Sequence, residues 1–95
     1  MAAYIVFIKE REHDAGLMAD YGKLAGPSLG GHPAKALAAY GAIETLEGPE
    51  AKGCVMIEFP DAAAARAWYD SDAYQEARKL RFAGADYRVF IAAGL

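Results

Sequence analysis

The stretch Ile57–Arg81, IEFPDAAAARAWYDSDAYQEARKLR, decides the fold of this chain. It opens with the end of a strand rich in apolar residues. Pro60 breaks that strand, because proline has no N–H to donate to a sheet. Asp61 follows at once and is a favourable N-cap, since its carboxylate can accept from the first free amides of a helix. We expect this helix to run from residue 61 to Tyr69.

A second helix begins after a short break near Ser71. Ser71 and Asp72 are both suitable caps, and with Asp72 as the cap Gln75 falls at the third helical position of a capping box. This helix is predicted over residues 72–83, and Gly84 closes it. The two helices occupy one connection between strands, so we interpret them as one α unit broken near Ser71.

The remaining elements are predicted from apolar periodicity and from turn residues. They are a strand over 3–9, a helix from the Asp14 cap to a stop at Gly26-Pro27, a loop over 28–35, a weak strand over 36–45 with a possible bulge at Gly41, a turn over 46–52, and strands over 53–59 and 86–92. This β-α-β-β-α-β order predicts a ferredoxin-like α+β fold with a four-stranded antiparallel sheet. Ninety-five residues form one domain, residues 1–95.

Composition and charge narrow the class of protein. The formal net charge is −3, and no run of lysine or arginine occurs, so nucleic-acid binding is not expected. No apolar run approaches the ~20 residues needed to span a bilayer, and no membrane partner is expected. The N-terminus, MAAYIVFIKERE, has no basic region and becomes charged after eight residues, too soon for a secretory signal. The single cysteine, Cys54, has no internal disulfide partner, which suits a reducing compartment. We expect a cytoplasmic protein.

The first and last strands carry apolar residues on both faces. In an antiparallel sheet with one wet face, apolar and polar residues alternate. Here one face takes Ala3, Ile5 and Phe7, and the other takes Tyr4, Val6 and Ile8. In the last strand Tyr87, Val89 and Ile91 oppose Arg88, Phe90 and Ala92. Helices from a fold of this kind cover only one face. We therefore expect a homodimer formed through the sheet faces.

Several residues of the 57–81 stretch resemble those of a known family. They are Ile57-Glu58-Phe59-Pro60, Ala67-Trp68-Tyr69, Ser71, Tyr74-Gln75, Ala77 and Arg81, together with Leu46-Glu47-Gly48 ahead of the third strand. This pattern resembles the uncharacterised family called domain of unknown function 1330, in the dimeric α+β barrel superfamily. The resemblance implies a homodimer whose two sheets face each other, and it implies no particular reaction. Relatives in the superfamily include cofactor-free monooxygenases and isomerases with a pocket between helices and sheet.

Arg81 is the sharpest candidate for a ligand contact. On a helical wheel it lies within the apolar stripe formed by Ala73, Tyr74, Ala77 and Leu80. A guanidinium at such a position needs a partner, because an unpaired buried charge is costly. It is able to clamp a substrate carboxylate. The alternative is a structural salt bridge or an aliphatic stem that carries its charge to solvent.

Four more residues are candidates for a ligand pocket. Glu58 and Arg88 interrupt apolar strands and suit an acid or base and an anion contact, or else ion pairs with Arg81 or across a dimer. Trp68 and Tyr74 lie around the helix break and suit an aromatic pocket wall, or else core packing.

The hydroxyls of Tyr4, Tyr21 and Tyr40 need partners when buried, so these residues are interface or pocket candidates.

Other motifs point away from metal and nucleophilic chemistry. His13 and His32 lie in predicted loops, without metal-ligand spacing to Cys54, and we expect no metal and no cofactor. Gly26-Pro27-Ser28-Leu29-Gly30 matches G-x-S-x-G, but a nucleophile elbow needs a strand before its serine, and a helix precedes Ser28. We favour a homodimer that binds a small organic molecule. Analogy of fold adds a cofactor-free enzyme of the monooxygenase or isomerase kind to this interpretation. The alternative is a non-catalytic ligand-binding or assembly module.

Overall fold

The computed structural model describes residues 1–95, and their elements follow the predicted order. They are β1 (Ala3–Glu12), α1 (Ala15–Ser28), β2 (Lys35–Ala39), β3 (Gly53–Phe59), α2 (Ala62–Tyr69), α3 (Asp72–Gly84) and β4 (Ala85–Ala93). The predicted ferredoxin-like α+β fold is confirmed, with α2 and α3 as the two pieces of the broken α unit. None of the helices has the length and apolar character that crossing a bilayer requires.

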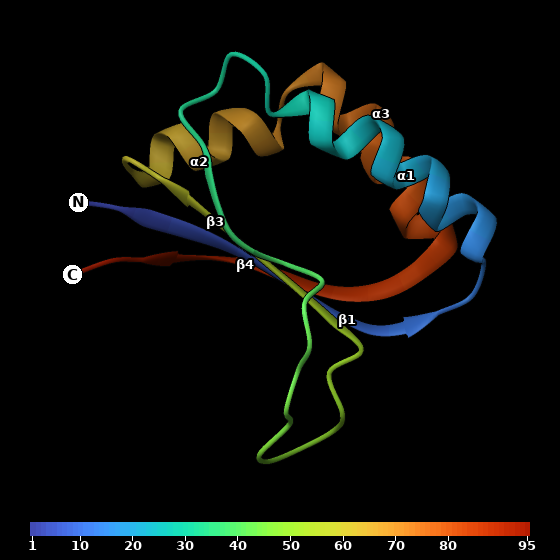
Figure 1. The fold of residues 1–95 in the computed structure, drawn as a ribbon. Coiled ribbons are helices and arrows are strands. Elements are labelled where there is room, and N and C mark those ends of the chain that lie inside the picture. The colour runs from blue at the N-terminus through green and yellow to red at the C-terminus, as the bar shows by residue number, and fades with distance from the viewer.

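The strands form one antiparallel sheet in the order β2-β3-β1-β4. All three helices lie on the same face of this sheet, and α1 packs along α3 (Figure 1). We call this the covered face and the opposite one the free face. The loop between β2 and β3 projects past the sheet on the side away from the helices (Figure 1).

The alternation of β1 assigns each residue to a face. Ile5 and Phe7 are buried beneath the helices, whereas Tyr4, Val6 and Ile8 point to the free face and are only partly buried. The main core lies on the covered face and consists of Ile5, Phe7, Tyr21, Ile57, Phe59, Ala65, Trp68, Tyr74 and Ala77. The free face therefore carries apolar side chains with no layer of this chain to cover them.

Helix α1 begins as predicted and ends later than predicted. The Asp14 carboxylate accepts from the Leu17 amide at 3.0 Å, which is the expected cap. The expectation that Gly26-Pro27 stops the helix is wrong, because α1 continues to Ser28. A proline in the last turn loses only one hydrogen bond, and the Leu29 amide closes that turn on the carbonyls of Gly26 and Pro27.

Strand β2 is half as long as the predicted strand over 36–45. It covers Lys35–Ala39, and its register against β3 shifts between Ala36 and Ala38 rather than at Gly41. Tyr40 ends it, because its φ of 57° lies in the left-handed region and turns the chain out of the extended conformation. A bulky residue seldom adopts this φ, so surrounding contacts must hold Tyr40 in place.

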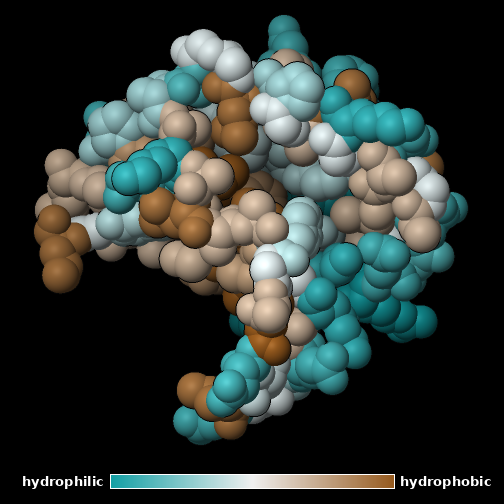
Figure 2. Space-filling view, viewed as in Figure 1, coloured by the Kyte–Doolittle hydropathy of each residue, from teal (hydrophilic) through white to brown (hydrophobic).

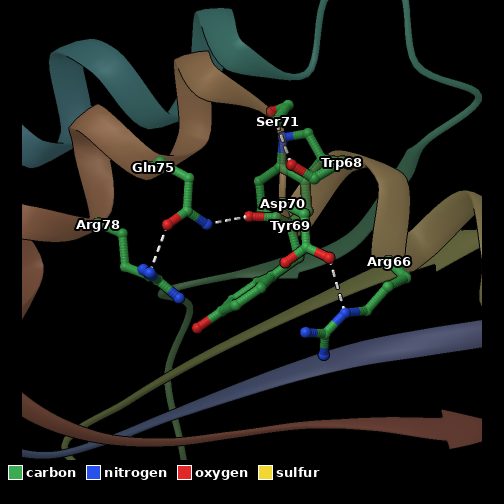
Figure 3. A network of polar contacts seen from close by, with 7 residues as sticks. All are labelled: Arg66, Trp68, Tyr69, Asp70, Ser71, Gln75 and Arg78. Carbon is green, nitrogen blue, oxygen red and sulfur yellow. Dashed lines mark hydrogen bonds and ion pairs between the residues drawn. The ribbon is translucent and has the colours of Figure 1, made fainter.

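The junction of α2 and α3 is held by a local polar network (Figure 3). The Ser71 hydroxyl donates to the Trp68 carbonyl at 2.7 Å and accepts from the Tyr74 amide at 3.3 Å, so Ser71 is the cap of α3. Gln75 does not complete a capping box; its side-chain amide donates to the Tyr69 carbonyl at 2.7 Å. These bonds tie the start of α3 to the end of α2 and fix the angle between the two helices.

Candidate functional site

A cavity of about 690 Å³ lies between α1 and the covered face of the sheet. Most of its lining is apolar, and it opens toward the edge formed by β2, where Figure 2 shows a recess between α1 and the chain of β2. Phe7, Val55 and Ile57 form its floor, and Trp68 closes one end. The size is that of a typical site for a small organic molecule.

The cavity exists because both of its walls carry small residues. Helix α1 turns Ala15, Ala19, Gly22, Ala25 and Gly26 toward it, together with Met18, and β2 contributes Ala36 and Ala39. A Cβ placed on Gly22 or Gly26 would meet no atom within 4 Å, so neither glycine is required by close packing. Larger residues at these positions would fill the space between the helix and the sheet.

Tyr40 and Tyr87 form a bridge across one end of the cavity. Their hydroxyls are 2.7 Å apart, although Tyr40 follows β2 and Tyr87 is on β4, the two edge strands of the sheet. The Tyr40 ring lies over Gly53, where a Cβ would approach its Cδ1 to 3.0 Å, and the Lys9 ammonium lies 5.6 Å from the ring centroid. Gly53 thus leaves the room that Tyr40 needs, and these contacts account for its unusual backbone conformation.

A second pair of hydroxyls lies at the inner wall. Tyr21 and Tyr74 are joined by a hydrogen bond of 2.9 Å between their oxygens. Arg81 Nε donates to the Tyr74 oxygen at 3.3 Å. Tyr21 lines the cavity, whereas Tyr74 and Arg81 lie behind its wall. The chain Arg81–Tyr74–Tyr21 therefore connects a buried cation to the cavity surface.

Arg81 is only 2% exposed and forms no salt bridge. Its guanidinium lies over the rings of Phe7, Phe82 and Tyr87 at 5.6, 5.0 and 5.1 Å. Neither sequence interpretation describes this arrangement fully. The structural salt bridge is absent, and Arg81 does not line the cavity itself, although Phe7 and Tyr87, which it touches, do.

Burial keeps the tyrosine hydroxyls of this region protonated. It is the main cause that raises the pKa of Tyr21, Tyr74 and Tyr87, and the positive charge of Arg81 opposes the rise without overcoming it. At neutral pH these groups are therefore neutral hydrogen-bond donors. They suit recognition of an acceptor oxygen on a bound molecule.

Trp68 combines packing with a place at the cavity. The ring is 2% exposed, stacks on Phe59 at a centroid distance of 5.9 Å and lies 4.3 Å from Tyr74. Its Nε1 donates to Ser28 Oγ at 3.1 Å, and Ser28 donates to the Ala25 carbonyl. Both functions of the Ser28 hydroxyl are thus used within the protein, in keeping with the rejection of a nucleophile elbow.

Glu58 and Arg88 lie on the free face, away from the cavity. Glu58 is in register with Tyr4 of β1, and Arg88 is in register with Ile8. Arg88 Nε pairs with Glu10 Oε1 at 2.8 Å, and both side chains are well exposed. The structure therefore brings together Trp68, Tyr74 and Arg81 on the helices but not Glu58 or Arg88. These two strand residues are in register with Tyr4 and Ile8, so they point to the face opposite to that of Ile5 and Phe7.

Sequence reasoning named two of the three cavity tyrosines without ranking them. Tyr21 and Tyr40 line the cavity, whereas Tyr4 faces the free side of the sheet. Tyr87 was assigned only to a sheet face. The useful signal was the run of small residues on one side of α1. No group of three or more His, Cys, Asp or Glu side chains lies close enough together to hold a metal ion.

We expect Arg81→Met to change the free energy of unfolding by less than about 1 kcal/mol, because no carboxylate loses its partner. Three ring contacts worth about 0.5–2 kcal/mol each are lost, and a desolvation penalty of several kcal/mol is relieved. Chemical denaturation measures the difference. Arg81→Ala is the control. It leaves an empty space where the side chain was, so it should lower the free energy of unfolding more than Arg81→Met does. A loss above about 3 kcal/mol for Arg81→Met would mean that the guanidinium itself holds the core together.

The fold and the cavity define a ferredoxin-like α+β protein with helices on one face of the sheet and an apolar pocket beneath them. Within this class, the chain belongs to the family described as Domain of unknown function (DUF1330), whose model matches residues 2–95. The resemblance noted in the sequence is thereby confirmed. No curated protein sequence matches the chain.

Three solved structures illustrate the similarity of fold. A protein of unknown function from Rhodopseudomonas palustris has a TM-score of 0.76 at 22% identity, over 99% of this chain and 82% of its own. A dimeric ferredoxin-like protein of unknown function from Jannaschia sp. CCS1 has a TM-score of 0.72 at 17% identity, over 99% and 100%. SnoaB, a cofactor-independent oxygenase from Streptomyces nogalater, has a TM-score of 0.60 at 8% identity, over 99% and 92%.

Proposed function

We propose that this protein is a homodimer that binds a small, mainly apolar organic molecule in the cavity between α1 and the sheet. The observation that carries the proposal is the cavity itself: about 690 Å³, apolar walls and three tyrosine hydroxyls, those of Tyr21, Tyr40 and Tyr87. Side chains normally fill the space between a helix and the sheet on which it packs, so an opening of this size, partly open to solvent, leaves room for a ligand. Pockets of this composition are typical of ligand sites.

The homodimer is supported by the free face. Ala38, Met56, Val6 and Phe90 lie in register across all four strands and form an apolar row there. A second copy of the sheet matches this row in width and character, as a two-fold dimer requires. The solved structure from Jannaschia sp. CCS1 is described as dimeric. In a dimer of this kind each subunit keeps its own pocket, because the pocket is on the other face.

Filling the cavity from Gly22 should abolish binding without loss of stability. Gly22→Phe places a ring in the cavity, where a Cβ meets no neighbour, and it removes a helix-interior glycine that costs about 0.5–1 kcal/mol. We expect 2-naphthylmethanol, a neutral apolar probe, to bind the unchanged protein and not Gly22→Phe, as measured by isothermal titration calorimetry.

Gly22→Ala is the matched control for this test. It gains more helix propensity than Gly22→Phe does, leaves most of the cavity open, and should bind the probe. Equal binding by Gly22→Phe and the unchanged protein would place the probe elsewhere and contradict the proposal.

Native mass spectrometry of the protein purified from its own host then identifies a natural occupant, as a mass in excess of the 10.1 kDa chain or its dimer.

Cofactor-free oxygenation is the second candidate function. Its support is the fold shared with the oxygenase from Streptomyces nogalater, together with protonated tyrosine donors able to stabilise negative charge that develops on an oxygen. Oxygen uptake by the protein with its co-purified ligand tests it. Release of the ligand unchanged, without oxygen uptake, would instead support the non-catalytic binding module.

A further inference from the structure

The charge of Arg81 has no anion to balance it within the protein. Its side chain is 2% exposed, and none of the ion pairs of the chain includes it. The groups around it are aromatic rings and tyrosine hydroxyls, which are dipoles and quadrupoles but carry no full charge. A buried guanidinium in such surroundings keeps a positive potential in its neighbourhood, because the low dielectric screens it poorly.

The hydrogen bonds from Arg81 to Tyr74 and from Tyr74 to Tyr21 both donate toward the cavity. Tyr74 is fully buried, and its oxygen accepts from Arg81 Nε. The Tyr21 oxygen, 2.9 Å away, is the only acceptor within hydrogen-bonding distance of the Tyr74 hydroxyl. A buried hydroxyl needs an acceptor for its proton, so Tyr74 donates to Tyr21. The Tyr21 hydroxyl already accepts that bond, and its own proton is left for the cavity that Tyr21 lines.

The other charged groups of the cavity cancel each other. Lys9 and Glu12 both line it, and their side chains form an ion pair of 3.0 Å between Nζ and Oε1. The remaining lining residues are neutral. The charge that an occupant meets is therefore the single positive charge of Arg81, which lies behind Phe7, Tyr21 and Tyr87.

We propose that the pocket selects molecules that carry a negatively charged oxygen, a carboxylate on an apolar body, and that the Tyr21 hydroxyl is its donor. This inference rests on the proposed function and adds the chemical class of the ligand. A carboxylate in an apolar pocket needs donors and a compensating charge. Tyr21 supplies the donor, and Arg81 supplies the charge without touching the ligand. Tyr74 is the positioning residue that links the two.

The test compares three probes that share one body: 2-naphthoate, 2-naphthylmethanol and 2-naphthylmethylamine. Bonds to charged acceptors are about twice as strong as bonds to neutral ones, so the carboxylate should bind the unchanged protein roughly tenfold more tightly than the alcohol. The amine, protonated at neutral pH, should bind more weakly than the alcohol. This comparison uses calorimetry on the unchanged protein and requires no substitution.

Two variants then assign the preference to the chain of hydroxyls. Tyr21→Phe and Tyr74→Phe each remove one oxygen and keep the ring, and each should reduce the carboxylate-to-alcohol ratio to about two or less. Tyr4→Phe, on the opposite face of the sheet, is the control and should keep the full ratio. Thermal unfolding of each variant shows that the fold is retained.

The outcomes separate this inference from the function on which it rests. Binding of the alcohol with no preference for the carboxylate, or a preference that survives Tyr21→Phe, overturns the inference and leaves the pocket as a binding site. Failure of all three probes to bind overturns both. A preference for the amine would show that Glu12, and not Arg81, sets the potential of the cavity.

Discussion

Replacing Trp68 by alanine is expected to lower the free energy of unfolding by about 3–5 kcal/mol, the range for a buried tryptophan. The ring is 2% exposed and lies among Phe7, Phe59 and Tyr74, so its removal leaves a cavity beside the existing one. It also leaves Ser28 Oγ without its indole donor. Urea denaturation followed by circular dichroism measures the change. Tryptophan fluorescence cannot be used, because Trp68 is the only tryptophan and the variant lacks it.

Trp68→Phe is the matched control for this prediction. It keeps most of the aromatic area and loses the indole N–H, so it should cost about 1–2 kcal/mol. If Trp68→Ala costs less than about 1 kcal/mol, the ring is not part of the core. It would then belong to the pocket alone, and its loss should appear in ligand affinity instead.

The features that sequence predicted well depend on local chemistry. The caps at Asp14 and Asp61 are carboxylates that accept from amides three residues ahead, at 3.0 and 2.7 Å. The break near Ser71 is equally local, because the serine hydroxyl contacts residues three positions away on each side. Each of these bonds lies within one helical turn, so the order of residues is enough to predict it.

The early end of β2, which sequence missed, depends on contacts between distant residues. Strand β2 ends at Tyr40, whose backbone is held by a hydroxyl bond to Tyr87 and by the space above Gly53. The continuation of α1 through Pro27 is instead local, because the Leu29 amide closes the turn on the carbonyls of Gly26 and Pro27. The Gly26-Pro27 pair favours a helix stop, and the run over 36–45 favours a longer strand. The local pattern therefore predicts the opposite of what the structure shows at both places.

The candidate site shows the same division. The helical wheel correctly predicted that Arg81 and Tyr74 face inward, because helical periodicity is a local property. It gave no information on the partners of Arg81. These include Tyr69 on α2, Phe7 on β1 and Tyr87 on β4. Glu58 and Arg88 were grouped with Arg81 by charge, but the pleat of the sheet directs them to the free face.

Phe90→Asp is expected to convert the proposed homodimer to monomer at micromolar concentration. Phe90 is 46% exposed in the isolated chain and ends the apolar row of Ala38, Met56 and Val6 on the free face. A dimer through this face should bury about 2,000 Å² in total. The two-fold axis places two unpaired aspartates in it, each costing about 3–5 kcal/mol when buried. Light scattering should then report the mass of one 10.1 kDa chain.

Leu24→Asp is the matched control, because Leu24 is 45% exposed but lies on α1, in the helical layer. It introduces the same charge on an equally exposed apolar residue and should remain dimeric. Ile8, which points to the free face, should respond to aspartate as Phe90 does, whereas Phe7 lies under the helices and its replacement should unfold the chain. A dimer that survives Phe90→Asp and dissociates with Leu24→Asp would place the interface on the helices. The pockets would then lie close to the subunit boundary, and each could depend on residues of the partner subunit.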